Sequence, residues 1–115
     1  MNDPVAERLD DLICACRAIT AYVARADLPA ELVADAVRMR LVEIGEVVRQ
    51  LPVSATRAEP GIPWTRLALL GERIVRRGAD AGASIVLGTA RTDVPALAAA
   101  AERLRERRNA RHHEG

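Results

Sequence analysis

Few residues in this chain could perform acid–base chemistry near neutral pH. The two histidines, His112 and His113, both lie at the C-terminal end. The rest of the chain therefore offers no Ser-His-Asp, Cys-His or Glu-x-x-His arrangement. Arginine cannot take the place of histidine, because its guanidinium group stays protonated in proteins. These residue types favour binding over catalysis.

Two clusters of arginine could contact phosphate groups. The first cluster is Arg73, Arg76 and Arg77, and the second is Arg103, Arg105, Arg107, Arg108 and Arg111. Glutamates interrupt both clusters, and no aromatic residue lies between the arginines to stack on a base. The 17 cationic side chains face 16 carboxylates, so the formal net charge of +1 gives no overall attraction to nucleic acid or membrane. Solvated charged faces are the simpler interpretation, and RNA binding through the first cluster is the alternative.

Metal and cofactor sites find little support in the sequence. Four carboxylates could gather on one helical segment: Glu31, Asp35, Glu43 and Glu46. Without a histidine directed inward, we interpret them as a polar helix face, and we expect no metal and no other cofactor. Cys14 and Cys16 are two residues apart on a predicted helix, so they point to different faces and cannot form a mutual disulfide. We expect Cys16 to be a small core residue.

Apolar residues that recur every three or four positions predict an all-α protein. Half of the 115 residues are apolar, Phe is absent, and the aromatic residues are one Trp and one Tyr, so the core must be aliphatic. We expect a bundle of four or five helices. The helical domain should cover residues 1–105, and residues 106–115 should form a charged, flexible tail.

Local signals set the expected ends of the helices. The predicted helices are residues 4–26, 30–51, 63–78, 79–89 and 93–105, and residues 54–57 could form a short helical turn within the long connection. Asp3 is a suitable N-cap for the first helix, and Pro52 ends the second. The first two long helices should form an antiparallel hairpin. Gly82 and Gly88 weaken the segment 79–89, and Pro95 suits the first turn of a separate final helix.

The sequence gives no sign of a membrane segment. No apolar run approaches the roughly 20 residues that a bilayer span needs. The first residues, MNDPVAERLDD, lack a basic region followed by an apolar stretch. We therefore expect a cytoplasmic protein with no membrane partner.

Three sequence landmarks occur together at consistent spacing. They are DAVRMRLVEIGEVVRQL at residues 35–51, IPW at residues 62–64 and DVP at residues 93–95. In this combination the chain resembles the HepT-like family of the HEPN superfamily. The resemblance implies an all-helical homodimer whose motif helices face each other across a cleft. It also implies a metal-independent ribonuclease toxin of a toxin-antitoxin pair, whose partner is a nucleotidyltransferase antitoxin.

The catalytic motif of that family is degenerate in this chain. The family carries an Arg seven residues after the Trp, then Asn or Asp, a His five residues after the Arg, and a Tyr two beyond the His. The corresponding residues here are Gly71, Glu72, Arg76 and Gly78. Gly71 supplies no cation, Glu72 places a negative charge where a phosphate would approach, and Arg76 cannot act as a base. Gly78 also removes the tyrosine that the partner of this family is thought to modify with AMP.

Several interpretations of function remain open. We prefer a pseudoenzyme of the HepT-like family that binds a nucleotidyltransferase partner or RNA. An active ribonuclease toxin using unrecognised residues is one alternative, and a helical adaptor or dimerisation module is another. Arg108, Asn109 and His113 match the letters of the family motif, but they lie in the predicted tail, where catalytic groups cannot be held in place.

Overall fold

The structure is a computed structural model that describes residues 2–77 and 82–114, with side chains described as far as Arg111. The described residues form five helices and no strand, which confirms the all-α prediction. The helices are α1 (Pro4–Val23), α2 (Ala30–Gln50), α3 (Val53–Ala58), α4 (Trp64–Arg77) and α5 (Ala83–Glu114). In the described part of the chain, no helix has an apolar stretch long enough to cross a membrane.

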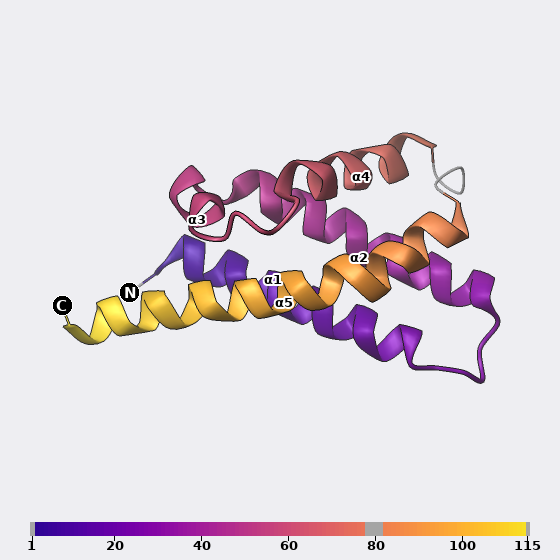
Figure 1. Ribbon diagram of the computed structural model, residues 1–115, viewed down its shortest axis with the longest axis horizontal. Coiled ribbons are helices and arrows are strands. Elements are labelled where there is room, and N and C mark those ends of the chain that lie inside the picture. Colours follow the sequence, from indigo (N-terminus) through magenta and orange to yellow (C-terminus); the bar gives the residue numbers. More distant parts are fainter. Residues whose placement is uncertain (1, 78–81, 115) are drawn as a thin grey trace.

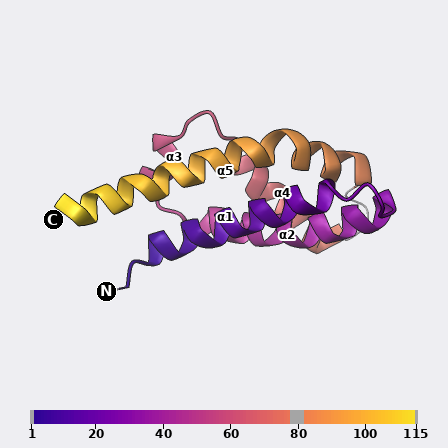
Figure 2. The same ribbon diagram turned by 90° about the horizontal axis from the view of Figure 1, so that it is seen from below.

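The bundle is elongated, with extents of 49 × 28 × 26 Å. Helices α1 and α2 run in opposite directions and form the predicted hairpin (Figure 1). Helix α5 lies along α1, and α4 lies along α2, so that the outer helices cover two sides of the hairpin (Figures 1 and 2). The short helix α3 joins α2 to the loop that precedes α4.

An aliphatic core holds the four long helices together, as the composition predicts. Its fully buried members come from α1, α2 and α5 and include Leu12, Ile19, Val37, Ile44 and Leu97. Each such side chain contributes roughly 1.5–3 kcal/mol when it is removed from water. The core therefore fixes which face of each helix points inward and which face remains for function.

The ends of α1 and α2 follow local signals. Asp3 is the N-cap of α1, where its Oδ1 accepts a hydrogen bond from the Ala6 N–H at 3.3 Å. Helix α1 ends at Val23, three residues before the predicted end, because turns and an ion pair between Arg25 and Asp27 form the connection. Helix α2 begins directly after Pro29, as predicted.

Helix α5 corrects the predicted break between residues 89 and 93. It is one helix of 32 residues that contains Pro95 in its interior. Its buried residues continue without interruption across the proline: Val86, Ala90, Val94, Leu97, Ala101 and Leu104. Pro95 itself is exposed, so its ring lies on the solvent side and the carbonyl that it leaves unpaired can bind water. Burial of this continuous apolar stripe outweighs the local cost of the proline.

Helix α5 continues into the segment predicted as a charged tail, residues 106–115. The chain remains helical to Glu114, and two arginines within the predicted tail bind distant carboxylates. Arg107 binds Glu59 at 2.9 Å, and Arg108 binds Asp3, the N-cap of α1, at 2.7 Å. The sequence shows no apolar partner for this segment, but ion pairs hold the extended helix against the rest of the bundle.

Candidate functional site

Helices α2 and α4 approach most closely at two glycines, Gly45 and Gly71. A Cβ atom added at Gly71 would lie 3.2 Å from the Cα atom of Gly45 and 3.2 Å from the carbonyl oxygen of Leu41. A Cβ atom added at Gly45 would lie 3.2 Å from the Cα atom of Gly71. Both neighbours are backbone atoms of a packed helix, so they cannot rotate away as a side chain can. Gly71, which the sequence resemblance sets at the arginine position of the HepT-like motif, is therefore a packing residue in this fold.

A network of four charges lies beside this glycine contact. Arg49 donates hydrogen bonds to Glu46 and Glu72, each at 2.5 Å, and Arg76 donates to the other oxygen of Glu72 at 3.4 Å. These side chains line a hollow of about 140 Å³ together with Gly71, Val42 and Val75. Two arginines and two glutamates nearly cancel in charge. A phosphate group in this hollow would meet the carboxylate of Glu72 instead of a free cation.

The first arginine cluster lies on the last turns of α4. Arg76 belongs to the network with Glu72, whereas Arg73 and Arg77 make no ion pair with any other residue that the structure describes. Cations near a helix C-terminus interact favourably with the helix dipole, so this position has a structural explanation as well as a functional one. Gly78, the fourth motif position, lies outside the described residues.

The second match to the motif letters is built into the bundle. Arg108 donates two hydrogen bonds to the carboxylate of Asp3, at 2.9 and 2.7 Å, and Asn109 accepts one from Arg105. His113 lies in the last turn of α5, and its side chain is outside the described part of the structure. The C-terminal ends of α4 and α5 lie at opposite ends of the long axis (Figure 1). The fold does not bring the two motif-like segments together.

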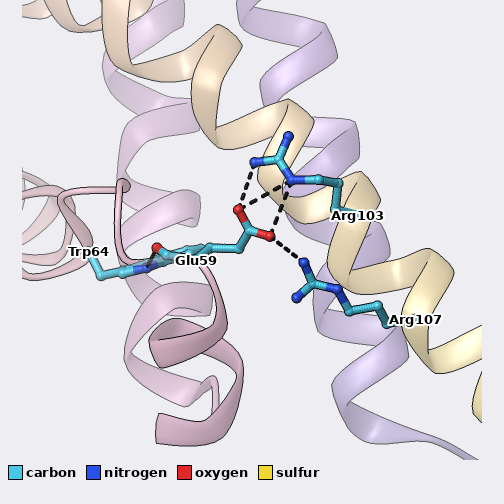
Figure 3. A network of polar contacts seen from close by, with 4 residues as sticks. All are labelled: Glu59, Trp64, Arg103 and Arg107. Carbon is cyan, nitrogen blue, oxygen red and sulfur yellow. Dashed lines mark hydrogen bonds and ion pairs between the residues drawn. The ribbon is translucent and has the colours of Figure 1, made fainter.

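Sequence reasoning missed a polar network around the buried Glu59, whose two arginine partners are about half exposed. The Glu59 carboxylate accepts hydrogen bonds from Arg103, the shortest at 2.6 Å, and from Arg107 at 2.9 Å (Figure 3). The indole N–H of Trp64 donates to the Glu59 backbone carbonyl at 3.0 Å. The hydrogen bonds from Arg103 lower the pKa of Glu59, and the charge of Arg107 lowers it further. Glu59 therefore joins the loop before α4 to α5.

The sequence contained one weak signal for this network. Arg103 and Arg107 are four residues apart, so they lie on the same face of a helix. Their partner Glu59 lies 44 and 48 positions away in the long connection, and no local pattern links them. Arg107 also lines a small hollow of about 60 Å³ beside Arg108 and Arg111. The contacts of Glu59 with Arg103 and Arg107 hold the loop before α4 against α5.

The remaining carboxylates and the cysteines are arranged as polar surface and core. Glu43 binds Arg40 at 3.1 Å, and Arg40 also donates to the hydroxyl of Tyr22. Within residues 2–77 and 82–111, no three histidine, cysteine or acidic side chains come together as a metal site would require. Cys14 is exposed and Cys16 is buried, which confirms their different faces. Burial, followed by the charge of Glu102, raises the pKa of Cys16 to about 12.

Exposed aliphatic side chains lie on the outer surface of α4 and at the start of α5, and others lie on α2 and α3. Leu69 is 56% exposed, Val75 is 67% exposed, and Ile85 at the start of α5 is 48% exposed. Aliphatic side chains beside arginines can bind a protein surface, and they provide no acid, base or nucleophile.

Comparison of this chain with protein-family models, with curated proteins and with solved structures finds no match.

Proposed function

We propose that this chain is a HepT-like HEPN protein that has lost ribonuclease catalysis and acts by binding a nucleotidyltransferase-type partner. The contact between Gly45 and Gly71 is the observation that carries the proposal. An arginine at position 71 would have to separate α2 from α4, so the position that should stabilise the phosphate serves helix packing instead. The family assignment itself rests on the sequence landmarks at residues 35–51, 62–64 and 93–95.

The charges around Gly71 support a loss of catalysis. Cleavage of RNA by the family route needs a cation near the phosphate and a group that exchanges a proton near neutral pH. Glu72 is occupied by Arg49 and Arg76, and Arg76 stands where the histidine would be. The described residues of this hollow include no histidine, and its two cations, Arg49 and Arg76, are paired with glutamates.

A protein partner is favoured over RNA by the surface of α4. Leu69 and Val75 are large, aliphatic and more than half exposed, and neither can stack on a base as an aromatic ring does. RNA remains the second candidate because Arg73 and Arg77 have no ion-pair partner in the described part of the chain. A homodimer is also part of the proposal. The mixed charges of Glu46, Arg49, Glu72 and Arg76 suit the pairing of two identical surfaces better than a purely basic face does.

The first test is an RNA cleavage assay. The purified full-length chain and a His113→Ala variant are incubated with mixed single-stranded RNA and transfer RNA in the absence of metal ions. We expect intact RNA with both proteins. Cleavage by the parent would refute the loss of catalysis, and its absence in the variant would assign the activity to the C-terminal end of α5.

The second test concerns the partner. The tagged full-length chain is expressed in its native host, and proteins that co-purify in stoichiometric amounts are identified by mass spectrometry. We expect a nucleotidyltransferase. Recovery of the chain without any nucleotidyltransferase would contradict this part of the proposal and would favour the helical adaptor.

A further inference from the structure

A second surface of α4 forms an apolar cleft with the beginning of α5. The cleft has a volume of about 290 Å³, and its apolar lining includes Leu69, Leu70 and Ile85. Leu69 is 56% exposed and Ile85 is 48% exposed, so much of this lining faces solvent. The volume lies at the low end of the range for small-molecule pockets, and it suits one or two large apolar side chains of a protein partner.

The two arginines that line the cleft differ in whether they have an ion-pair partner. Arg66 binds both oxygens of Asp93 at 3.0 Å, so its charge is largely neutralised. Arg73 has no ion-pair partner within the described residues, and Arg77 follows one turn later on α4. The cleft therefore combines an apolar lining with the positive charge of Arg73. A ligand that complements this cleft would present an apolar side chain flanked by carboxylates.

We propose that the cleft between α4 and α5 binds an acidic amphipathic helix of the partner protein, with a leucine-like side chain inserted between Leu69 and Ile85 and a carboxylate placed against Arg73. Binding of an amphipathic helix in an apolar groove is a common mode of recognition. This inference rests on the proposed function, because it specifies the surface and the chemistry through which the partner is held.

Two other occupants fit the cleft less well. RNA would leave Leu69 and Ile85 against its phosphates and sugars, with no aromatic side chain in the cleft to stack on bases. A second copy could offer the exposed Leu32 and Met39 of α2, which are flanked by Glu31 and Asp35. Asp35 is already bound to Arg38 of its own helix, which reduces its attraction to Arg73.

A synthetic peptide tests the chemistry of the cleft with the full-length protein. The probe is a fluorescein-labelled helical peptide of about 18 residues, long enough to form a helix, with leucines on one face and glutamates on the other. Fluorescence anisotropy measures its affinity for the parent and for Leu69→Glu, Arg73→Glu and Met39→Glu. All three positions are exposed, so the substitutions should leave the fold intact. A twin peptide with lysine in place of glutamate tests the charge.

The expected results are specific to the cleft. Leu69→Glu and Arg73→Glu should each weaken binding of the acidic peptide by about tenfold or more, which corresponds to about 1.4 kcal/mol. Met39→Glu should leave the affinity unchanged, and the lysine peptide should bind more weakly than the acidic one. Salt should reduce binding to the parent more than binding to Arg73→Glu.

Several outcomes would overturn the inference. The inference would be refuted if the acidic peptide did not bind, or if Leu69→Glu left its affinity unchanged. It would also be refuted if the lysine peptide bound as well as the acidic one. Displacement of the peptide by labelled oligouridine would assign the cleft to RNA. Concentration-dependent self-association in sedimentation equilibrium that is lost in both Leu69→Glu and Met39→Glu would assign it to a second copy. RNA cleavage by the parent would refute the proposed function while leaving peptide binding in the cleft intact, so the two failures can be distinguished.

Discussion

Substitution of Gly71 by alanine tests whether this motif position serves packing. The added Cβ atom would lie 3.2 Å from the Gly45 Cα atom, whereas favourable carbon–carbon contacts lie at about 3.5–4.0 Å. Helices α2 and α4 would therefore have to separate by a few tenths of an ångström. Overpacking of this kind costs about 1–3 kcal/mol, and the better helix propensity of alanine returns roughly 0.5–1 kcal/mol. We expect a net destabilisation of about 0.5–2 kcal/mol.

Gly88 provides a matched control within the same protein. It lies inside α5, and a Cβ atom added there would meet no atom within 4 Å other than those of the neighbouring residues and backbone of its own helix. Gly88→Ala should therefore stabilise the protein by about 0.5–1 kcal/mol through helix propensity alone. The propensity gain is common to both variants. The difference between them isolates the contact at Gly45, and it should be about 1–3 kcal/mol.

Urea unfolding followed by circular dichroism measures the free energy of unfolding of each variant, with the slope m as a check that the unfolding reaction is unchanged. For a domain of this size, each 1 kcal/mol should correspond to about 4 °C in the melting temperature. If Gly71→Ala stabilised the protein as much as Gly88→Ala, the close approach of α2 and α4 would be refuted. The main support for the proposed loss of catalysis would then be lost as well.

Three further predictions concern other parts of the structure. Glu59→Gln should lower the free energy of unfolding by about 1 kcal/mol at pH 7. Because the folded-state pKa of Glu59 is lowered, its contribution is complete above the unfolded-state value of about 4.3 and is lost as the pH falls below it. The difference between parent and variant should therefore shrink toward pH 3 in urea titrations, and a constant difference would contradict the role of the charge. A disulfide reagent at pH 8 should label the exposed Cys14 rapidly. It should label Cys16 only after unfolding, because Cys16 is buried and has a pKa of about 12. Equal labelling rates in the folded protein would be inconsistent with the packing of α1. A chain that is truncated after Arg105 loses the ion pairs of the last turns of α5, and its free energy of unfolding should fall by about 1 kcal/mol. An unchanged melting temperature would mean that these turns are not held to the bundle.

Local sequence signals predicted most helices correctly. The apolar spacing and the residues at the ends of α1, α2 and α4 lie within a few positions of one another in the chain, so they can be read without the fold. The same signals failed at α5. A proline inside a helix costs about 3 kcal/mol locally, but burial of Val94 and Leu97 on either side of Pro95 offsets this cost.

Residue types alone establish which chemical groups are present: no histidine before residue 112, a glycine at position 71, and a glutamate and an arginine at positions 72 and 76, where the expected motif has other residues. The folded arrangement of the helices establishes that Gly71 meets Gly45, that Glu72 lies between Arg49 and Arg76, and that Glu59 holds Arg103. Glu72 and Arg76 lie on one turn of α4, and the other contacts join residues that are far apart in the chain. Their partners are chosen by the packing of whole helices, which no local pattern specifies.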